Sequence, residues 1–156
     1  MKKNILLSIA TALALSACSP KMSPGIYSGY VRYDGTPTVG IVSLTTTGFG
    51  KNQAESSEDA MAGAFYTLLF KGVPGSAYEL PMVPHEDEKK NDPTIVELLN
   101  GGFHSFVTAD VLQNQEIMVK KNDGVKGKMT THLVSINCDA LRRHLEQHAV
   151  ISKFGL

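Results

Sequence analysis

Apolar residues recur at intervals of three and four positions between residues 57 and 71, which is the spacing of one face of an α-helix. Ser56 or Ser57 can cap this segment, and Gly72 can end it. The pattern therefore predicts a helix over 57–71, whose small residues would let its axis lie close to a sheet. Its apolar positions are Ala60, Met61, Ala64, Phe65, Leu68 and Leu69.

Other segments are rich in β-branched and aromatic residues, as strands are. Two of them, 26–33 and 38–46, flank a segment with turn chemistry and predict a hairpin. Further strands are expected over 103–111, 116–121 and 125–137, with a turn at 122–124. In the last strand the apolar phase changes after Leu133, which predicts a β-bulge near Leu133-Val134 or a transfer between faces.

The remaining segments hold fewer apolar residues. Residues 73–84 contain three prolines, so they form an edge strand at best. Residues 85–91 are charged and predict a solvated loop. A capping residue and a proline, Asp92-Pro93, then predict a short helix over 93–99.

A second long helix is predicted over 140–149, with Asn137 or Asp139 as its cap. Its buried side consists of Leu141, Leu145 and Ala149. Together these segments predict an α+β fold, in which a mostly antiparallel sheet carries the two long helices on one face and one short helix is added.

The first eighteen residues have a different pattern from the rest. Two lysines precede an apolar run over 5–15, and Leu15-Ser16-Ala17-Cys18 follows. The run is shorter than the roughly 20 residues of a membrane-spanning helix. The segment resembles the signal of bacterial lipoproteins cleaved by signal peptidase II, whose lipobox is a hydrophobic-small-small-Cys pattern. The simpler alternative is a secretory signal in which the cysteine is coincidental.

The lipoprotein resemblance implies cleavage before Cys18, a diacylglyceryl thioether on its sulfur and an acyl group on its new amine. Two or more acyl chains anchor a protein stably to a membrane. Ser19 follows the cysteine where the inner-membrane convention has Asp. We therefore expect a signal peptide over 1–17, a lipidated tether over 18–25 and a single α+β domain over 26–156, in the bacterial cell envelope and at the outer membrane.

Composition narrows the range of partners. Removal of the signal leaves 139 residues, with 13 basic against 15 acidic side chains. Nucleic-acid binding requires a clustered basic excess, which this balance does not provide. The membrane, through Cys18, is thus the first expected partner, and nucleic acid is not expected.

Gly48-Phe49-Gly50-Lys51 stands between a predicted strand and a predicted helix, where phosphate-binding loops occur. The spacing does not fit. A Walker loop would need Gly and Ser or Thr where Thr45 and Asn52 stand, and a dinucleotide loop would need Gly where Gln53 stands. We therefore expect a strand-to-helix turn that uses glycine flexibility, and no cofactor.

His144 and His148 are four residues apart, so they share one face of the predicted last helix. They could hold a transition metal, although Leu145 stands where the metalloprotease motif has Glu. The alternative is a pair of solvated surface histidines. The acidic run 86–88 lacks the alternating oxygen ligands and the glycine of a calcium loop.

Cys138 has no expected disulfide partner, because Cys18 is assigned to lipid. It shares a strand face with Val134 and Ile136, which favours burial. A helix begins just after it, so an activated thiol stays open as the alternative.

The strand that ends in Gly-x-Gly over 42–51, followed by an alanine-rich helix, resembles a pattern of small bacterial envelope lipoproteins. It is also similar to the N-terminal domain of a flagellar assembly protein. The closing segments 139–146 and 151–155 resemble the tail of uncharacterised lipoproteins from gut-type anaerobes. This resemblance implies a non-enzymatic domain that binds or scaffolds another envelope component. The alternatives are a metal-dependent hydrolase built on His144 and His148, and a small-ligand carrier with an apolar pocket between sheet and helices.

Overall fold

The computed structural model describes residues 29–36, 38–119 and 126–153. Its strands form one antiparallel sheet in the order β1-β2-β4-β3. Their bounds are Val31–Tyr33 for β1, Ile41–Gly50 for β2, Val107–Val119 for β3 and Lys126–Asn137 for β4. The predicted hairpin is confirmed by the pairing of β1 with β2, while the turn at 122–124 and the start of the first strand at 26–28 lie outside the described residues.

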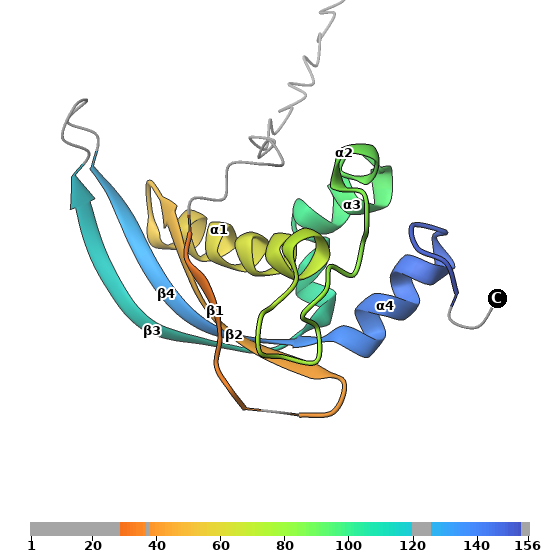
Figure 1. Ribbon diagram of the computed structural model, residues 1–156. Coiled ribbons are helices and arrows are strands. Elements are labelled where there is room, and N and C mark those ends of the chain that lie inside the picture. The colour runs from red at the N-terminus through yellow and green to blue at the C-terminus, as the bar shows by residue number, and fades with distance from the viewer. Residues whose placement is uncertain (1–28, 37, 120–125, 154–156) are drawn as a thin grey trace, which may run out of the picture.

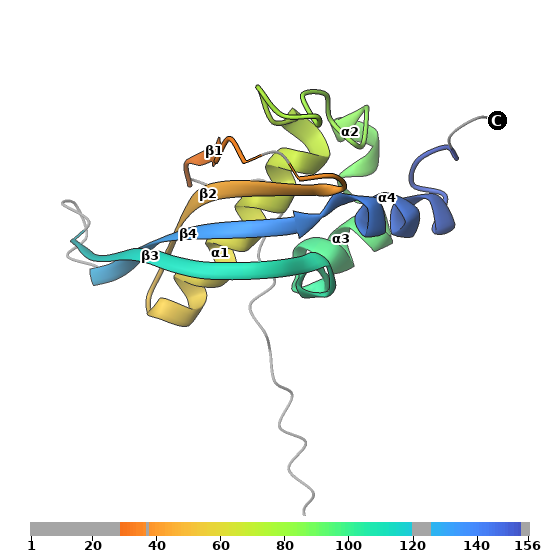
Figure 2. The same cartoon turned by 90° about the horizontal axis from the view of Figure 1, so that it is seen from below.

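The long strands of the sheet curve, and helix α1 lies along their concave side (Figure 1). Seen from below, β2, β4 and β3 lie in front of α1 with no helix over them (Figure 2). The helical segments are α1 (Gln53–Tyr66), the π-helical turn η1 (Thr67–Lys71), α2 (Glu86–Lys89), α3 (Pro93–Leu99), the 3₁₀ turn η2 (Gly102–Phe106) and α4 (Cys138–Gln147). The predicted α+β class is confirmed.

Helix α1 begins earlier than its hydrophobic pattern predicts. Its cap is Asn52, whose side chain accepts a hydrogen bond from the backbone N–H of Glu55 at 2.9 Å. The Glu55 carboxylate in turn accepts from the N–H of Lys51 at 3.0 Å, which completes a reciprocal cap. The prediction of Ser56 or Ser57 as the cap is therefore wrong. Ser56 is fully buried, and its hydroxyl hydrogen-bonds with that of Thr130 at 3.0 Å.

The proline-rich stretch that follows this helical segment forms hydrogen bonds with the end of the segment. The N–H of Gly72 donates to the carbonyl of Thr67, as in a π-helical turn. Two carbonyls of η1 then accept hydrogen bonds from residues 82 and 83, at 3.3 and 2.8 Å. Residues 73–84 form no strand, because their donors serve this helix end instead of a sheet edge.

Strand β3 is longer and starts later than predicted. The residues before it, 102–106, form the 3₁₀ turn η2, and the expected break between two strands is absent. Irregular pairing with β4 falls between Val107 and Ala109 and between Leu112 and Asn114. The irregularities of this strand pair thus lie in β3, where none was predicted.

Strand β4 keeps one phase from Thr130 to Asn137, and its register with β2 is continuous. Its covered positions are Thr130, His132, Val134 and Ile136. The apparent phase change arises because two covered positions are polar and hydrogen-bonded, whereas Leu133 lies on the opposite face beside Val111. The prediction of a bulge at Leu133-Val134 is therefore wrong.

The hydrophobic core lies between the covered face of the sheet and the helices. Phe65 of α1 stacks on Phe103 of η2 with ring centroids 5.5 Å apart. At the start of α3, the Asp92 side chain accepts from the N–H of Thr94 at 2.9 Å, which confirms the predicted cap.

Helix α4 continues directly from β4. The Asn137 side chain caps it by accepting from the N–H of Ala140 at 2.9 Å, and Leu141 and Leu145 are fully buried. The third residue expected on the buried side, Ala149, is exposed. The helix ends at Gln147, so that position already lies in the turn that follows.

That turn is a Schellman motif. Ala149 has a left-handed backbone with φ 55°, and its N–H donates to the carbonyl of Glu146. The N–H of Val150 donates to the carbonyl of Leu145 at 2.9 Å. Val150, 4% exposed, takes the buried place that was expected for Ala149.

Candidate functional site

Cys18, the predicted lipidation site, lies outside the described residues, as does the predicted tether over 18–25. The anchor stays a prediction from the lipobox. Among the helices that the structure describes, none combines the length and the apolar character needed to cross a membrane.

His144 and His148 lie side by side, with ring centroids 4.5 Å apart. The ring centroid of Phe106 lies 5.3 Å from that of His144. The pKa of His144 is lowered, first by burial and then by His148, while Glu97 acts in the opposite direction. Across the described ranges no group of three or more His, Cys, Asp and Glu side chains is arranged to hold a metal ion. The pair therefore does not complete a zinc ligand set here.

Cys138 is fully buried, and its thiol donates to the carbonyl of Ile136 at 3.6 Å. Burial raises its pKa to about 12. A thiol with that pKa stays protonated at neutral pH, so it lacks the thiolate that a nucleophile needs. The predicted burial of this residue is confirmed.

The two glycines of the Gly48-Phe49-Gly50 motif serve close packing. A Cβ on Gly48 would lie 2.1 Å from the carbonyl oxygen of Ser56 and 2.2 Å from the nitrogen of Ala60. Neither glycine has a positive φ. They are required because the α1 backbone lies against the end of β2, and the prediction that they provide flexibility is wrong. The motif itself lies within β2, and the turn to α1 follows it.

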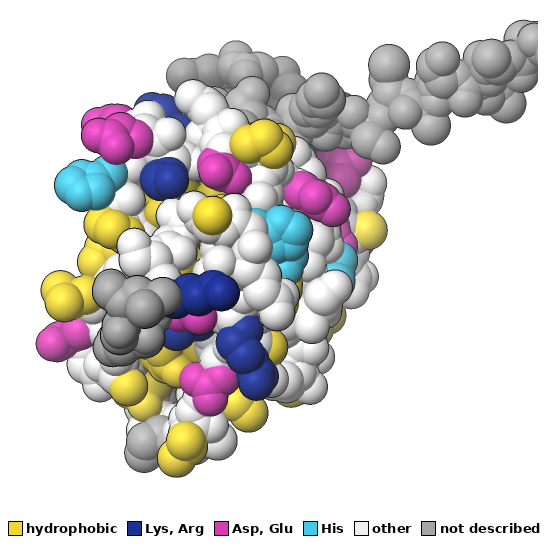
Figure 3. All heavy atoms as spheres, turned by 90° about the vertical axis from the view of Figure 1, so that its right-hand side faces the viewer, with side chains coloured by type: hydrophobic (Ala, Val, Ile, Leu, Met, Phe, Trp, Pro, Cys, Tyr) yellow, Lys and Arg dark blue, Asp and Glu magenta, His cyan; other side chains and the backbone are white. Residues whose placement is uncertain are grey.

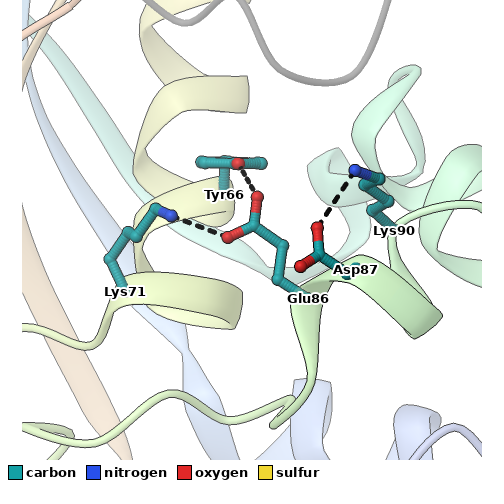
Figure 4. A network of polar contacts seen from close by, with 5 residues as sticks. All are labelled: Tyr66, Lys71, Glu86, Asp87 and Lys90. Carbon is teal, nitrogen blue, oxygen red and sulfur yellow. Dashed lines mark hydrogen bonds and ion pairs between the residues drawn. The ribbon is translucent and has the colours of Figure 1, made fainter.

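The acidic run 86–88 forms the one-turn helix α2 instead of the predicted loop. Glu86 is the residue that fixes it. Its carboxylate accepts hydrogen bonds from the Tyr66 hydroxyl and from the Lys71 ammonium, the latter at 2.6 Å (Figure 4). The Lys71 hydrogen bond and then the Tyr66 one hold the pKa of Glu86 below its ordinary value. This contact ties α2 to the end of the long helix.

The sequence patterns did not predict a set of buried polar residues at the contact between α1 and the sheet. His132, 3% exposed, hydrogen-bonds through Nδ1 to Asp110 at 2.6 Å, and its Nε2 is buried without a partner. Asp59, 5% exposed, accepts from the N–H of Phe49 at 2.9 Å, and burial raises its pKa. Among the described residues, His132 is paired with Asp110 through Nδ1, and it contributes with Asp59 to a set of buried polar groups beside α1.

Strand β3 presents the most open surface of the fold. It pairs with β4 on one side and, in the described part of the chain, with no strand on the other. Residues 108–116 are exposed, including two large apolar side chains: Val111 at 54% and Leu112 at 42%. These two lie in a short regular stretch between the two irregularities of the strand. The edge thus offers unpaired backbone groups together with apolar side chains.

The uncovered face of the sheet adjoins this edge. Alternate residues of β2 and β4 on it are half-buried, among them Thr45 and Leu133. The hydroxyls of Ser43 and Ser135 hydrogen-bond to each other across the two strands at 2.9 Å. Small polar side chains therefore alternate here with apolar ones.

Comparison with known proteins adds no relative. No protein-family model, no curated protein sequence and no solved structure matches this chain. Function must be argued from the chain's own residues.

Proposed function

We propose that this protein is a membrane-anchored envelope lipoprotein that binds another envelope protein without catalysing a reaction. The observation that carries the proposal is the free edge of β3, a 13-residue strand with exposed Val111 and Leu112. Soluble proteins usually protect an edge of this kind, because it can pair with a strand from another chain. An extended segment of a partner would add to the sheet here and cover the two apolar side chains.

The charge of the edge indicates the partner's chemistry. The charged residues among 107–116 are Asp110 and Glu116, both acidic. A segment with alternating apolar residues and a Lys or Arg would match this edge better than an acidic one, because like charges opposite each other destabilise a sheet. The irregularities of β3 limit the regular pairing to a few residues, which suits a reversible contact.

The lipid anchor supports the same proposal. Eleven residue steps separate Cys18 from Gly29, the first described residue. Such a segment spans at most about 40 Å even when fully extended. The domain would therefore stay within about one domain diameter of the membrane, where the effective concentration of other envelope proteins is high.

A photo-cross-linking side chain placed at Val111 in living cells tests the binding site. We expect a discrete adduct with an envelope protein, lost when Leu112→Lys is added. The matched control position is Val39, which is 97% exposed in the β1–β2 hairpin. Equal adducts at both positions, or none at Val111, would count against the proposal.

The anchor has its own test. We expect Cys18→Ser to abolish lipid attachment and to leave an uncleaved precursor, measured by metabolic labelling with palmitate and by gel mobility. A variant that is still processed and labelled would refute the lipobox assignment.

A further inference from the structure

The histidine pair at the end of α4 has the spacing of a two-point metal chelate. His144 lies in the last turn of the helix, and His148 is the residue that caps its C-terminal end. The backbone between them is still helical, because the N–H of His148 donates to the carbonyl of His144 at 3.1 Å. The two side chains therefore leave the same face of α4, and their ring centroids lie 4.5 Å apart.

Neighbouring contacts restrict both histidines. The Schellman turn that follows α4 places Val150 in the core and so fixes the backbone directly after His148. The ring of Phe106 packs beside that of His144, which limits the orientations open to this imidazole. A chelate whose donors are already side by side loses little conformational freedom when a metal binds.

Both rings are within reach of solvent, since His148 is exposed and His144 is half-buried. Figure 3 looks at this end of the molecule and shows His side chains at its surface beside acidic ones. Glu97 of α3 lies close enough to His144 for its negative charge to act on the ring, which favours a cation there. In the described ranges no third His, Cys, Asp or Glu joins the pair as a ligand. A bound metal would therefore take its other ligands from solvent.

The spacing of the two rings distinguishes between metals. A metal about 2.0 Å from a coordinating imidazole nitrogen lies about 3.2 Å from the centroid of that ring. Two centroids 4.5 Å apart then subtend an angle of about 90° at the metal. Neighbouring ligands of a tetragonal Cu(II) ion make this angle, whereas tetrahedral Zn(II) would need centroids about 5.2 Å apart. Cu(II) is also the divalent first-row metal that nitrogen ligands bind most tightly.

We propose that His144 and His148 bind one Cu(II) ion as a bidentate chelate, with solvent in the remaining coordination positions. The site binds and releases the ion without a redox or catalytic step. The proposal is independent of the β3 edge, because neither histidine belongs to that strand or contacts Val111 and Leu112 through any hydrogen bond or ring contact of the described residues.

Cu(II) alone is the probe, titrated into the full-length protein in a neutral detergent and a non-coordinating buffer at neutral pH. We expect one equivalent to bind, with the electron paramagnetic resonance spectrum of a tetragonal centre split by two nitrogen ligands. His144→Gln and His148→Gln should each weaken binding at least about tenfold, because a single imidazole lacks the second, intramolecular bond of the chelate. If His144→Gln fails to fold, His148→Gln decides the matter at an exposed position. No saturable binding, or wild-type affinity in His148→Gln, overturns the proposal.

Two controls test the pairing itself. His104→Gln removes another exposed histidine, which contacts Glu58 at 3.0 Å, and should bind Cu(II) as the wild type does. The double variant Arg143→His, His144→Gln keeps the number of histidines but sets the two rings five positions apart, on different faces of the helix. It should bind as weakly as His144→Gln alone. Wild-type affinity in the double variant would show that the two rings do not act as one chelate, and so overturns the proposal.

Zn(II) in the same titration tests the choice of metal. It should bind at least about tenfold more weakly than Cu(II), because two imidazoles at this spacing leave the tetrahedral ligand set of zinc incomplete. Equal or tighter binding of Zn(II) overturns the assignment to Cu(II).

Discussion

The interface between α1 and the sheet differs at its two ends. Where the first half of α1 crosses the end of β2 and the start of β4, the covered residues are polar or small: Thr46, Gly48, Ser56, Asp59, Thr130 and His132. Where the second half of α1 and the following η1 cross, they are large and apolar: Leu44, Phe65, Leu68, Leu69, Val134 and Ile136. One helix is thus held on one sheet by two kinds of contact.

The difference teaches how packing distance and chemistry are linked. At the polar end the two backbones are so close that Gly48 has no room for a methyl group, and hydrogen bonds replace side-chain volume. One of them runs from the Thr46 hydroxyl to the Ala60 carbonyl at 2.8 Å. Such directional contacts fix the position of the helix along the sheet. At the apolar end, area removed from water supplies most of the stability.

The largest expected effect is at the apolar end. Phe65→Ala should lower the free energy of unfolding by about 4 kcal/mol, because it leaves a cavity beside Phe103. Urea unfolding measures the change. Phe49→Ala is the control, since Phe49 is 37% exposed, alternates with the covered positions of β2 and has its ring beside Gly127, and it should lose about 1 kcal/mol or less. Equal losses would show that the buried contacts at the apolar end carry no special weight.

The polar end should show its largest effect at Gly48. Gly48→Ala should cost about 3 kcal/mol, because its methyl group would overlap backbone atoms of α1 that cannot move without displacing the helix. Gly35→Ala is the comparison. It meets no atom within 4 Å and strains only its own backbone, at φ 85°, for about 1 kcal/mol. If the two cost the same, the close approach of α1 is not what the glycine serves.

The apolar end could be predicted from the sequence, and the polar end could not. Apolar spacing located the segment that forms α1 and η1, since large residues such as Phe65 and Leu68 recur every three or four positions. The same reasoning failed on β4, where Thr130 and His132 are covered. A buried hydroxyl or imidazole is stable there because it hydrogen-bonds to a partner that is distant in sequence. The amino-acid sequence alone does not identify that partner.

The candidate sites also divide into those that could be predicted from the sequence and those that could not. Burial of Cys138 followed from its strand neighbours, which are local. The Schellman turn after α4 did not, because it forms at an alanine. Glycine is the usual residue at that position, so Ala149 concealed the turn. The free edge of β3 could not be predicted either, because it follows from the order of the strands in the sheet. That order depends on pairing between segments that are distant in sequence.

Buried hydroxyls at the polar end should have a moderate effect. Thr130→Val keeps the shape of the side chain and removes one of the two partners of the Ser56 hydroxyl, which also donates to the Gln53 carbonyl at 3.2 Å, so it should cost about 1 kcal/mol in urea unfolding. Thr131→Val changes the next residue, which lies on the uncovered face of β4, and should stay within about 0.5 kcal/mol of wild type. A similar loss at both positions would show that the hydrogen bond under α1 has no special role.

The smallest expected effect is a change in the free energy of unfolding with pH, which depends on Asp59. Because burial raises its folded-state pKa above the ordinary 3.8, the folded protein holds a proton that the unfolded chain has already released. The free energy of unfolding therefore falls as pH rises through the folded pKa. Asp59→Asn keeps an oxygen for the N–H of Phe49, so its stability relative to wild type should rise with pH in the mildly acidic range.

Glu86 provides the opposite slope, because Lys71 and Tyr66 lower its pKa below the ordinary 4.5. Its contribution to stability is present above that value and is lost as pH falls through the folded pKa. Glu86→Gln should thus lose stability relative to wild type as pH rises, while Asp59→Asn gains. Urea unfolding from pH 3 to 7 distinguishes the two variants by sign alone. If the stabilities of the two variants, relative to wild type, change with pH in the same direction, then Asp59 is solvated and water reaches the polar end of the α1 interface.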